Sequence, residues 1–136
     1  MATSPKRRSP APRKTPEKAG SKLPRPVSKP FIRFYHSEEL RKKTLSTVTA
    51  LEQATDQTTH RAALADIAVE LTNTGMDYFF MEPLKAAKAG FIVQQSANIG
   101  LAGARQVMGT VIRNIIGRMD APQLLSVCGS IRQLML

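Results

Sequence analysis

The sequence is notable first for what it lacks. Cys128 is the only cysteine among 136 residues, which excludes a disulfide within the chain and a cysteine-rich zinc site. No apolar run approaches the roughly eighteen residues that a membrane span needs. Met1 is followed by basic and proline residues rather than an apolar stretch, so no secretory signal is expected. These absences predict an intracellular protein, located in the cytoplasm, nucleoid or nucleus.

Catalytic and metal-binding motifs are also missing. His36 and His60 are the only histidines, and neither has a nucleophile or carboxylate at an informative spacing. The carboxylates of Asp66 and Glu70 lie one helical turn apart, but the Glu-x-x-His pair that completes metal sites in helical bundles is absent. A solvated polar face is the favoured interpretation of these acids. We therefore expect no enzyme activity, catalytic residue, metal or cofactor.

Positive charge is concentrated at one end of the chain. Residues 1–36 contain ten of the twenty Lys/Arg residues and one acid, which gives +9, whereas the other residues hold ten Lys/Arg and nine Asp/Glu, which gives +1. Seven of the nine prolines lie in the same 36 residues, and no large aliphatic or aromatic residue lies between Met1 and Leu23. Proline blocks helix and sheet hydrogen bonds, and so little apolar surface cannot offset chain entropy. We predict that residues 1–30 form a disordered tail.

The charge of this tail predicts contact with nucleic acid. Cations on a flexible chain displace counterions from phosphates and bind without sequence preference. The segment Ser4-Pro5-Lys6-Arg7-Arg8 and the Ser-Pro and Thr-Pro segments after it resemble elements in the tails of linker histones, which implies contact with DNA phosphates. Arg41, Lys42 and Lys43 would extend this surface. The residues expected to contact phosphate in the tail are Lys6, Arg7, Arg8, Arg13, Lys14, Lys18 and Lys22. The alternatives are a solubilising tail or one that touches anionic lipid.

Apolar residues recur at spacings of three and four within residues 37–136. This pattern predicts an all-α domain, a small bundle of four to five helices. Residues 31–36, with three aromatic side chains, form an aromatic junction that is expected to dock the tail onto this domain. Ser37 and Asp120 are the expected N-caps of the first and last helices. Pro83 is expected to kink or break the second helix. The expected helices span about 37–57, 59–82, 84–89, 91–118 and 121–136.

The second long helix is apolar on more than one side. Its main stripe includes Leu64 and Phe79, while a second flank carries Val69, Met76 and Phe80. The favoured interpretation is a helix buried centrally between others, and the alternative is an interface with a partner or a second copy. Val69, Met76 and Phe80 are therefore the candidate partner-interface residues.

The helix expected at 91–118 contains Gly100, Gly103 and Gly109, each of which costs about 1 kcal/mol relative to alanine. No strand precedes them and no GK[ST] follows, so a phosphate-binding loop is disfavoured. Ala97, Gly100 and Ala104 lie on or near its apolar side, so close packing of another helix is predicted there instead. Arg105 and Arg113 are assigned to the polar side of this helix.

These features together predict a non-catalytic binding protein. Its basic tail contacts nucleic acid without sequence preference, while the helical domain self-associates or docks a protein partner. One alternative is a helical interaction or scaffold module that acts through the domain alone. Another is a peripheral protein on anionic lipid or a granule surface, where amphipathic helices and a basic tail also act together.

Overall fold

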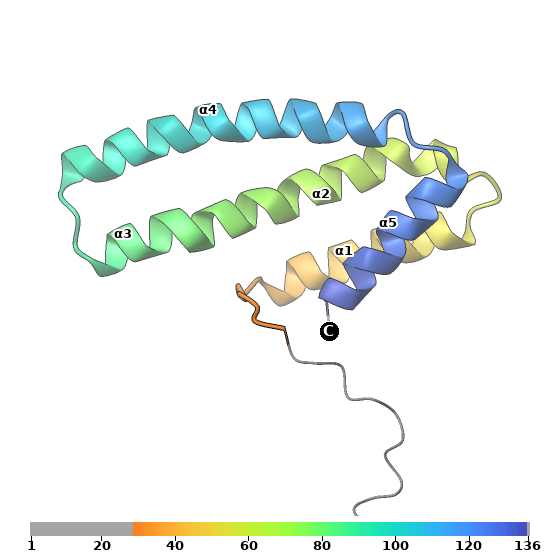
Figure 1. The fold of residues 1–136 in the computed structure, drawn as a ribbon, viewed down its shortest axis with the longest axis horizontal. Helices are drawn as coiled ribbons and strands as arrows, with labels where there is room; N and C mark the ends of the chain where they lie inside the picture. Colours follow the sequence, from red (N-terminus) through yellow and green to blue (C-terminus); the bar gives the residue numbers. More distant parts are fainter. Residues whose placement is uncertain (1–28, 136) are drawn as a thin grey trace, which may run out of the picture. The chain divides into compact units, whose positions relative to one another are not determined.

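A computed structural model of the chain describes residues 29–135 (Figure 1). The described residues fall into two units, whose boundary lies between Ile32 and Arg33. In the first unit, residues 29–32 have no regular secondary structure. The second unit folds into helices and short connections, which confirms the predicted all-α class. The expected tail cations, from Lys6 to Lys22, lie outside the described residues.

Five α-helices and two short helical turns make up the described part of the second unit. The turn η1 immediately precedes α2, and the π-helical turn η2 joins α2 directly to α3. Arg61–Ala86 is therefore one continuous helical segment, and α4 runs back beside it (Figure 1). The bounds are α1 (Glu38–Gln53), η1 (Gln57–His60), α2 (Arg61–Met76), η2 (Asp77–Met81), α3 (Glu82–Ala86), α4 (Phe91–Ile116) and α5 (Ala121–Leu134).

Side-chain caps fix where the helices begin. The Ser37 hydroxyl accepts a hydrogen bond from the Leu40 backbone N–H at 3.0 Å, and the Asp120 carboxylate accepts one from the Gln123 N–H at 2.9 Å. The Gln123 side chain accepts a hydrogen bond from the Asp120 N–H in return, which completes a capping box. Both N-caps expected from the sequence are thus confirmed.

Pro83 does not break the helix in which it lies. A proline lacks the backbone N–H and crowds the carbonyl four residues earlier, which here belongs to Phe79. The turn η2 lies just before it, and in this turn the Glu82 N–H donates to the Asp77 carbonyl five residues back. This wider turn takes up the disturbance, so the helix continues through α3. Of the kink or break expected at Pro83, no break occurs, and a π turn lies just before the proline.

The hydrophobic core lies where α1 and α5 meet the first half of α2 and the end of α4. Val48, Leu51, Leu64, Leu124 and Cys128 are fully buried there. Helix α2 packs against α1 as well as α4, as the favoured interpretation expected, whereas Phe80 at the far end of the same segment is exposed. The core therefore occupies one end of the helical unit, while α3 and the first half of α4 extend beyond it (Figure 1).

Candidate partner-binding surface

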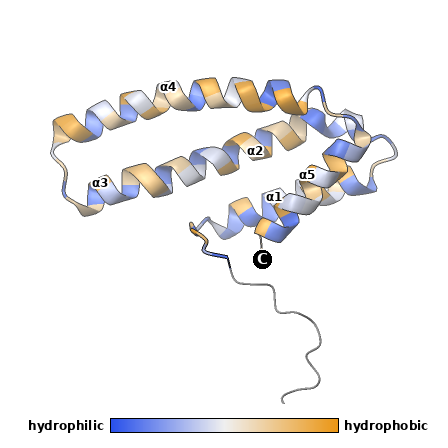
Figure 2. Ribbon diagram, viewed as in Figure 1, coloured by the Kyte–Doolittle hydropathy of each residue, from blue (hydrophilic) through white to orange (hydrophobic). Residues whose placement is uncertain are grey.

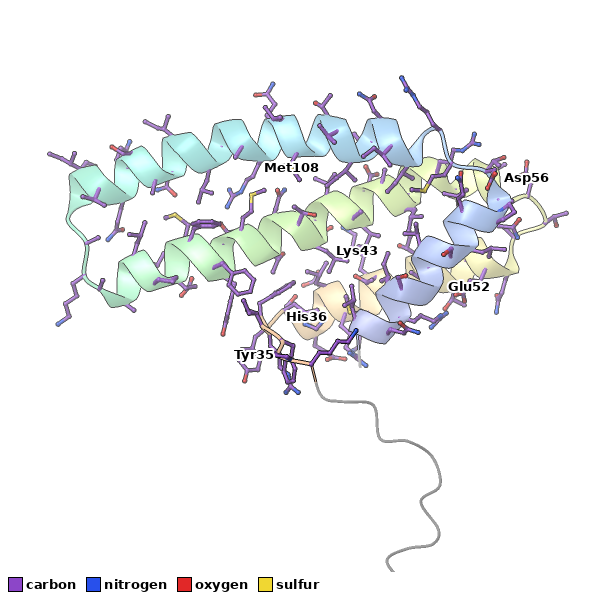
Figure 3. All side chains as sticks on the ribbon, viewed as in Figure 1. Tyr35, His36, Lys43, Glu52, Asp56 and Met108 are labelled. Carbon is purple, nitrogen blue, oxygen red and sulfur yellow. The ribbon has the colours of Figure 1, made fainter. Side chains whose placement is uncertain are left out.

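Helix α4 leaves most of its surface uncovered. Of its 26 residues, Gly109 and Ile116 are the buried ones. Side chains stand out along the side of α4 that is turned away from α2 (Figure 3). Hydrophobic residues recur along its whole length (Figure 2), and many of them are exposed. Such an extended exposed apolar surface is typical of a site that another molecule covers.

Six of these residues share one face, which we call the α4 outer face. They follow one another at alternating spacings of four and three, which returns the chain to the same side of a helix. Five of the six are exposed and one, Ala97, is half-buried. The residues of the α4 outer face are Val93, Ala97, Gly100, Ala104, Val107 and Val111.

A groove of about 420 Å³ adjoins this face. Ala97 and Gly100 belong both to the groove and to the outer face, so the two form one continuous apolar surface. The other wall of the groove comes from η2 and α3 and includes Phe80, which is 60% exposed. The groove is lined by Phe79, Phe80, Pro83, Leu84, Ala97, Gly100 and Leu101.

The glycines of α4 differ in what surrounds them. A Cβ atom added at Gly109 would lie 3.8 Å from Val69 Cγ1, so this glycine marks the close approach of α4 to α2. Added Cβ atoms at Gly100 and Gly103 would meet nothing within 4 Å. The close packing of another helix expected around Gly100 is therefore absent within the described chain, and α4 approaches α2 closely at Gly109 instead.

Two ion pairs lie between α4 and the segment formed by α2 and η2. Arg105 pairs with Asp77, and Arg113 pairs with Asp66. These arginines are the only charged residues of α4, so its outer face carries no charge. The two arginines were expected on a solvated polar side, but they pair with Asp66 of α2 and Asp77 of η2. Both pairs are partly exposed and contribute little to stability, so the packing of Gly109 and Ile116, rather than charge, places the outer face away from α2.

Glu70 of α2 is also paired with a cation. Glu70 accepts a hydrogen bond from the Lys43 ammonium group of α1, and this bond raises the pKa of Lys43 above its ordinary value. Arg41, two residues earlier, donates to the Met135 backbone carbonyl. Two of the three cations expected to extend the basic tail thus interact with the helical domain itself.

The three residues expected at a partner interface differ in their exposure. Val69 is half-buried beside Gly109, and Met76 is half-buried as well. Phe80 is exposed at the edge of the groove. The residues of the α4 outer face were not among those expected at a partner interface, although Ala97, Gly100 and Ala104 were expected to pack against another helix.

Aromatic side chains from the segment before α1 pack on η2. The ring centre of Phe34 lies 5.9 Å from that of Phe79 and 6.3 Å from that of Tyr78. The His36 imidazole Nε2 lies 3.2 Å from Met135 Sδ (His36 is labelled in Figure 3). This segment therefore connects the π turn with the end of α5.

Other groups that carry chemistry have structural surroundings. Cys128 is buried in the core, and burial raises the pKa of its thiol. Within residues 29–135, no three His, Cys, Asp or Glu side chains come together as a possible metal site. None of the helices in this part of the chain is both long and apolar enough to cross a membrane.

Comparison with known proteins identifies no relative from which the role of these features could be inferred. No protein-family model, curated protein or solved structure matches the chain. The α4 outer face and its adjoining groove are therefore interpreted from their own geometry and charge.

Proposed function

We propose that this chain is a non-catalytic binding protein with two binding elements. The helical domain associates with another helical surface through the α4 outer face and the groove beside Phe80. The basic N-terminal tail contacts nucleic acid without sequence preference. The observation that carries the proposal is the continuous, uncharged apolar surface of α4 and the groove.

The exposed apolar surface supports an association role because its exposure to water is unfavourable for an isolated monomer. The groove residue Phe80 and the outer-face residues Val93 and Val107 are all more than half exposed. Monomeric proteins rarely leave more than a few hundred Å² of contiguous apolar surface in water. Covering these side chains with a second apolar helix removes that surface from water and stabilises a complex.

The distribution of charge supports the role of the tail. The helical domain is close to neutral, and Asp66, Glu70 and Asp77 are each paired with a cation of the domain. The excess of positive charge therefore belongs to the tail. Seven cations separated by prolines and small residues can follow a phosphate backbone in many registers, which favours binding without sequence preference.

The test of the tail is the salt dependence of its affinity for a labelled DNA duplex, measured by fluorescence anisotropy. If the seven expected residues each neutralise one phosphate, the slope of log K against log salt is about −6. A shortened chain that begins at Pro30 is expected to lose this binding. A full-length variant with glutamine in place of the seven expected residues controls for tail length; it keeps Arg25 and Lys29, so it should bind only slightly more tightly than the shortened chain.

Two outcomes would contradict the role of the tail. One is no binding of full-length protein to duplex DNA or single-stranded RNA at low salt. The other is binding that persists unchanged in the glutamine variant. The association surface of α4 is tested separately below, so failure of one element leaves the other measurable.

A further inference from the structure

We propose that the α4 outer face binds a second copy of the same face, so that two chains form an antiparallel homodimer centred near Ala102. This inference rests on the proposed function, in which the outer face is the association surface, and it identifies the occupant of that surface. The groove beside Phe80 then belongs to the dimer interface.

The spacing of the outer face makes it complementary to itself. Its six residues follow at intervals of four, three, four, three and four, and this series reads the same in both directions. A twofold axis near Ala102 therefore places each residue opposite another member of the set, as in antiparallel coiled coils. The resulting pairs are Val93 with Val111, Ala97 with Val107, and Gly100 with Ala104.

The sizes of the paired residues match. Gly100 opposite Ala104 allows the two helices to approach closely at the centre of the interface, where the added-Cβ position of Gly100 is open. Val107 of the second copy comes opposite Ala97, at the groove. This register gives the groove an apolar side chain to accommodate, and it covers the exposed ring of Phe80.

Charge favours a second copy over a charged partner or a lipid surface. The α4 outer face has no ionisable side chain, and Arg105 and Arg113 are paired with acids of the same chain. Two copies therefore meet without repulsion between like charges. Amphipathic helices that lie on anionic membranes carry Lys and Arg on the polar face, where these cations contact the headgroups. In α4 the corresponding cations are engaged with η2 and α2.

The outer face extends over several turns of α4, whose 26 residues form a helix about 39 Å long. A standard stable interface buries about 800 Å² on each partner, so the dimer needs the groove and Phe80 as well as the pair of helices. The centre of this surface is apolar, as dimer interfaces require.

The first test is sedimentation of the full chain and two matched variants. Val107→Glu puts a charge at a position that is 63% exposed on the outer face, and Ile99→Glu does the same at a position that is 67% exposed on a different face of α4. We expect wild type and Ile99→Glu to be dimers. Val107→Glu should weaken dimerisation by at least tenfold while keeping the wild-type helical circular dichroism, since this position is not buried in the monomer.

The second test fixes the orientation of the helices. Val93 and Val111 are separated by 18 residues, about 27 Å along one helix, so a disulfide between cysteines at these positions must join two chains. We expect a mixture of isotopically labelled Val93→Cys and unlabelled Val111→Cys to form the mixed disulfide. Buried Cys128 remains reduced in both. Disulfides within each variant population instead would indicate parallel pairing and overturn the proposed register.

Several results would overturn the second-copy proposal and leave the role of the tail intact. A wild-type chain that sediments as a monomer at all concentrations is one, and equal weakening by both glutamate variants is another. If the monomer floats with vesicles of anionic lipid in a manner that Val107→Glu abolishes, the occupant is a membrane. A wild-type chain that forms dimers but binds no nucleic acid would instead refute only the role of the tail.

Discussion

At the scale of single residues, the clearest specific contact joins α1 to α5. The Glu52 carboxylate accepts hydrogen bonds from Arg132 Nε at 3.0 Å and from Arg132 Nη2 at 2.8 Å. The same Nη2 donates to the Thr49 hydroxyl at 2.7 Å (Glu52 is labelled in Figure 3). This forked arrangement holds the two helices in one register over the core. The hydrogen bonds from Arg132 lower the pKa of Glu52 below its ordinary value of 4.5.

The lowered pKa gives Glu52 a pH-dependent role in stability. A carboxylate with a depressed pKa stabilises the fold above its ordinary pKa, and this contribution is lost as the pH falls through the folded-state value. We expect Glu52→Gln to reduce the free energy of unfolding by about 0.5–1 kcal/mol at pH 7, the range for a partly exposed pair. Urea unfolding monitored by circular dichroism should show the difference shrinking at acid pH.

The matched control is Glu82→Gln, which removes an exposed carboxylate paired with Lys85 at 3.4 Å on the same helix. That substitution should change the free energy of unfolding by a few tenths of a kcal/mol or less. An equal effect of the two substitutions at pH 7 would show that the contact between Glu52 and Arg132 adds nothing beyond a solvated pair.

At the scale of elements, the connection from α3 to α4 contains a strained residue. Lys88 has φ 56°, in the left-handed region that residues with a Cβ rarely adopt. The chain needs this conformation to end α3, because the Ala89 N–H then donates to the Leu84 carbonyl at 3.0 Å. Gly90, the N-cap residue of α4, is in an extended conformation. A glycine at position 88 would adopt the same turn without strain.

We therefore expect Lys88→Gly to stabilise the protein by about 0.5–1 kcal/mol, despite the greater freedom of glycine in the unfolded chain. Thermal unfolding should show a higher midpoint. Ala87→Gly is the matched control, because Ala87 has an ordinary φ of −78° and should gain nothing from the change. A lower midpoint for Lys88→Gly would contradict the interpretation of Lys88 as a strained cap.

At the scale of the whole helical unit, stability is distributed unevenly. The buried residues of the core cluster come from α1, α2, α5 and the end of α4. In contrast, α3 and residues 91–108 of α4 contain no buried side chain. A helical segment with few buried contacts opens more readily than one in the core. The first half of α4 is thus the part that gains most from a partner.

Hydrogen exchange should reveal this difference. In the Val107→Glu variant, backbone amides of residues 95–106 should exchange faster than those of Leu64 and Leu124, which are fully buried. In wild type, the same α4 amides should be protected more strongly as protein concentration rises, while those of the core change little. Uniform exchange along α4 and the core would contradict the uneven distribution of stability.

The sequence by itself determined the helical class and the helix starts, because these depend on local spacing and on caps such as Ser37 and Asp120. It also determined the opposition between a basic tail and a nearly neutral domain, since charge is a property of composition. It predicted a disturbed helix at Pro83, and the structure shows this disturbance as a π turn within a continuous helical segment, which local rules do not predict.

Only the tertiary structure decided which side of α4 meets the rest of the domain. This helix has apolar residues on more than one face, so periodicity alone could not identify the covered one. Gly109 approaches Val69 of α2 and Ile116 enters the core, while the pairs of Arg105 with Asp77 and of Arg113 with Asp66 lie on the same side of α4. The apolar outer face is exposed as a result, because burial of one side of a helix depends on contacts with segments that are distant in sequence.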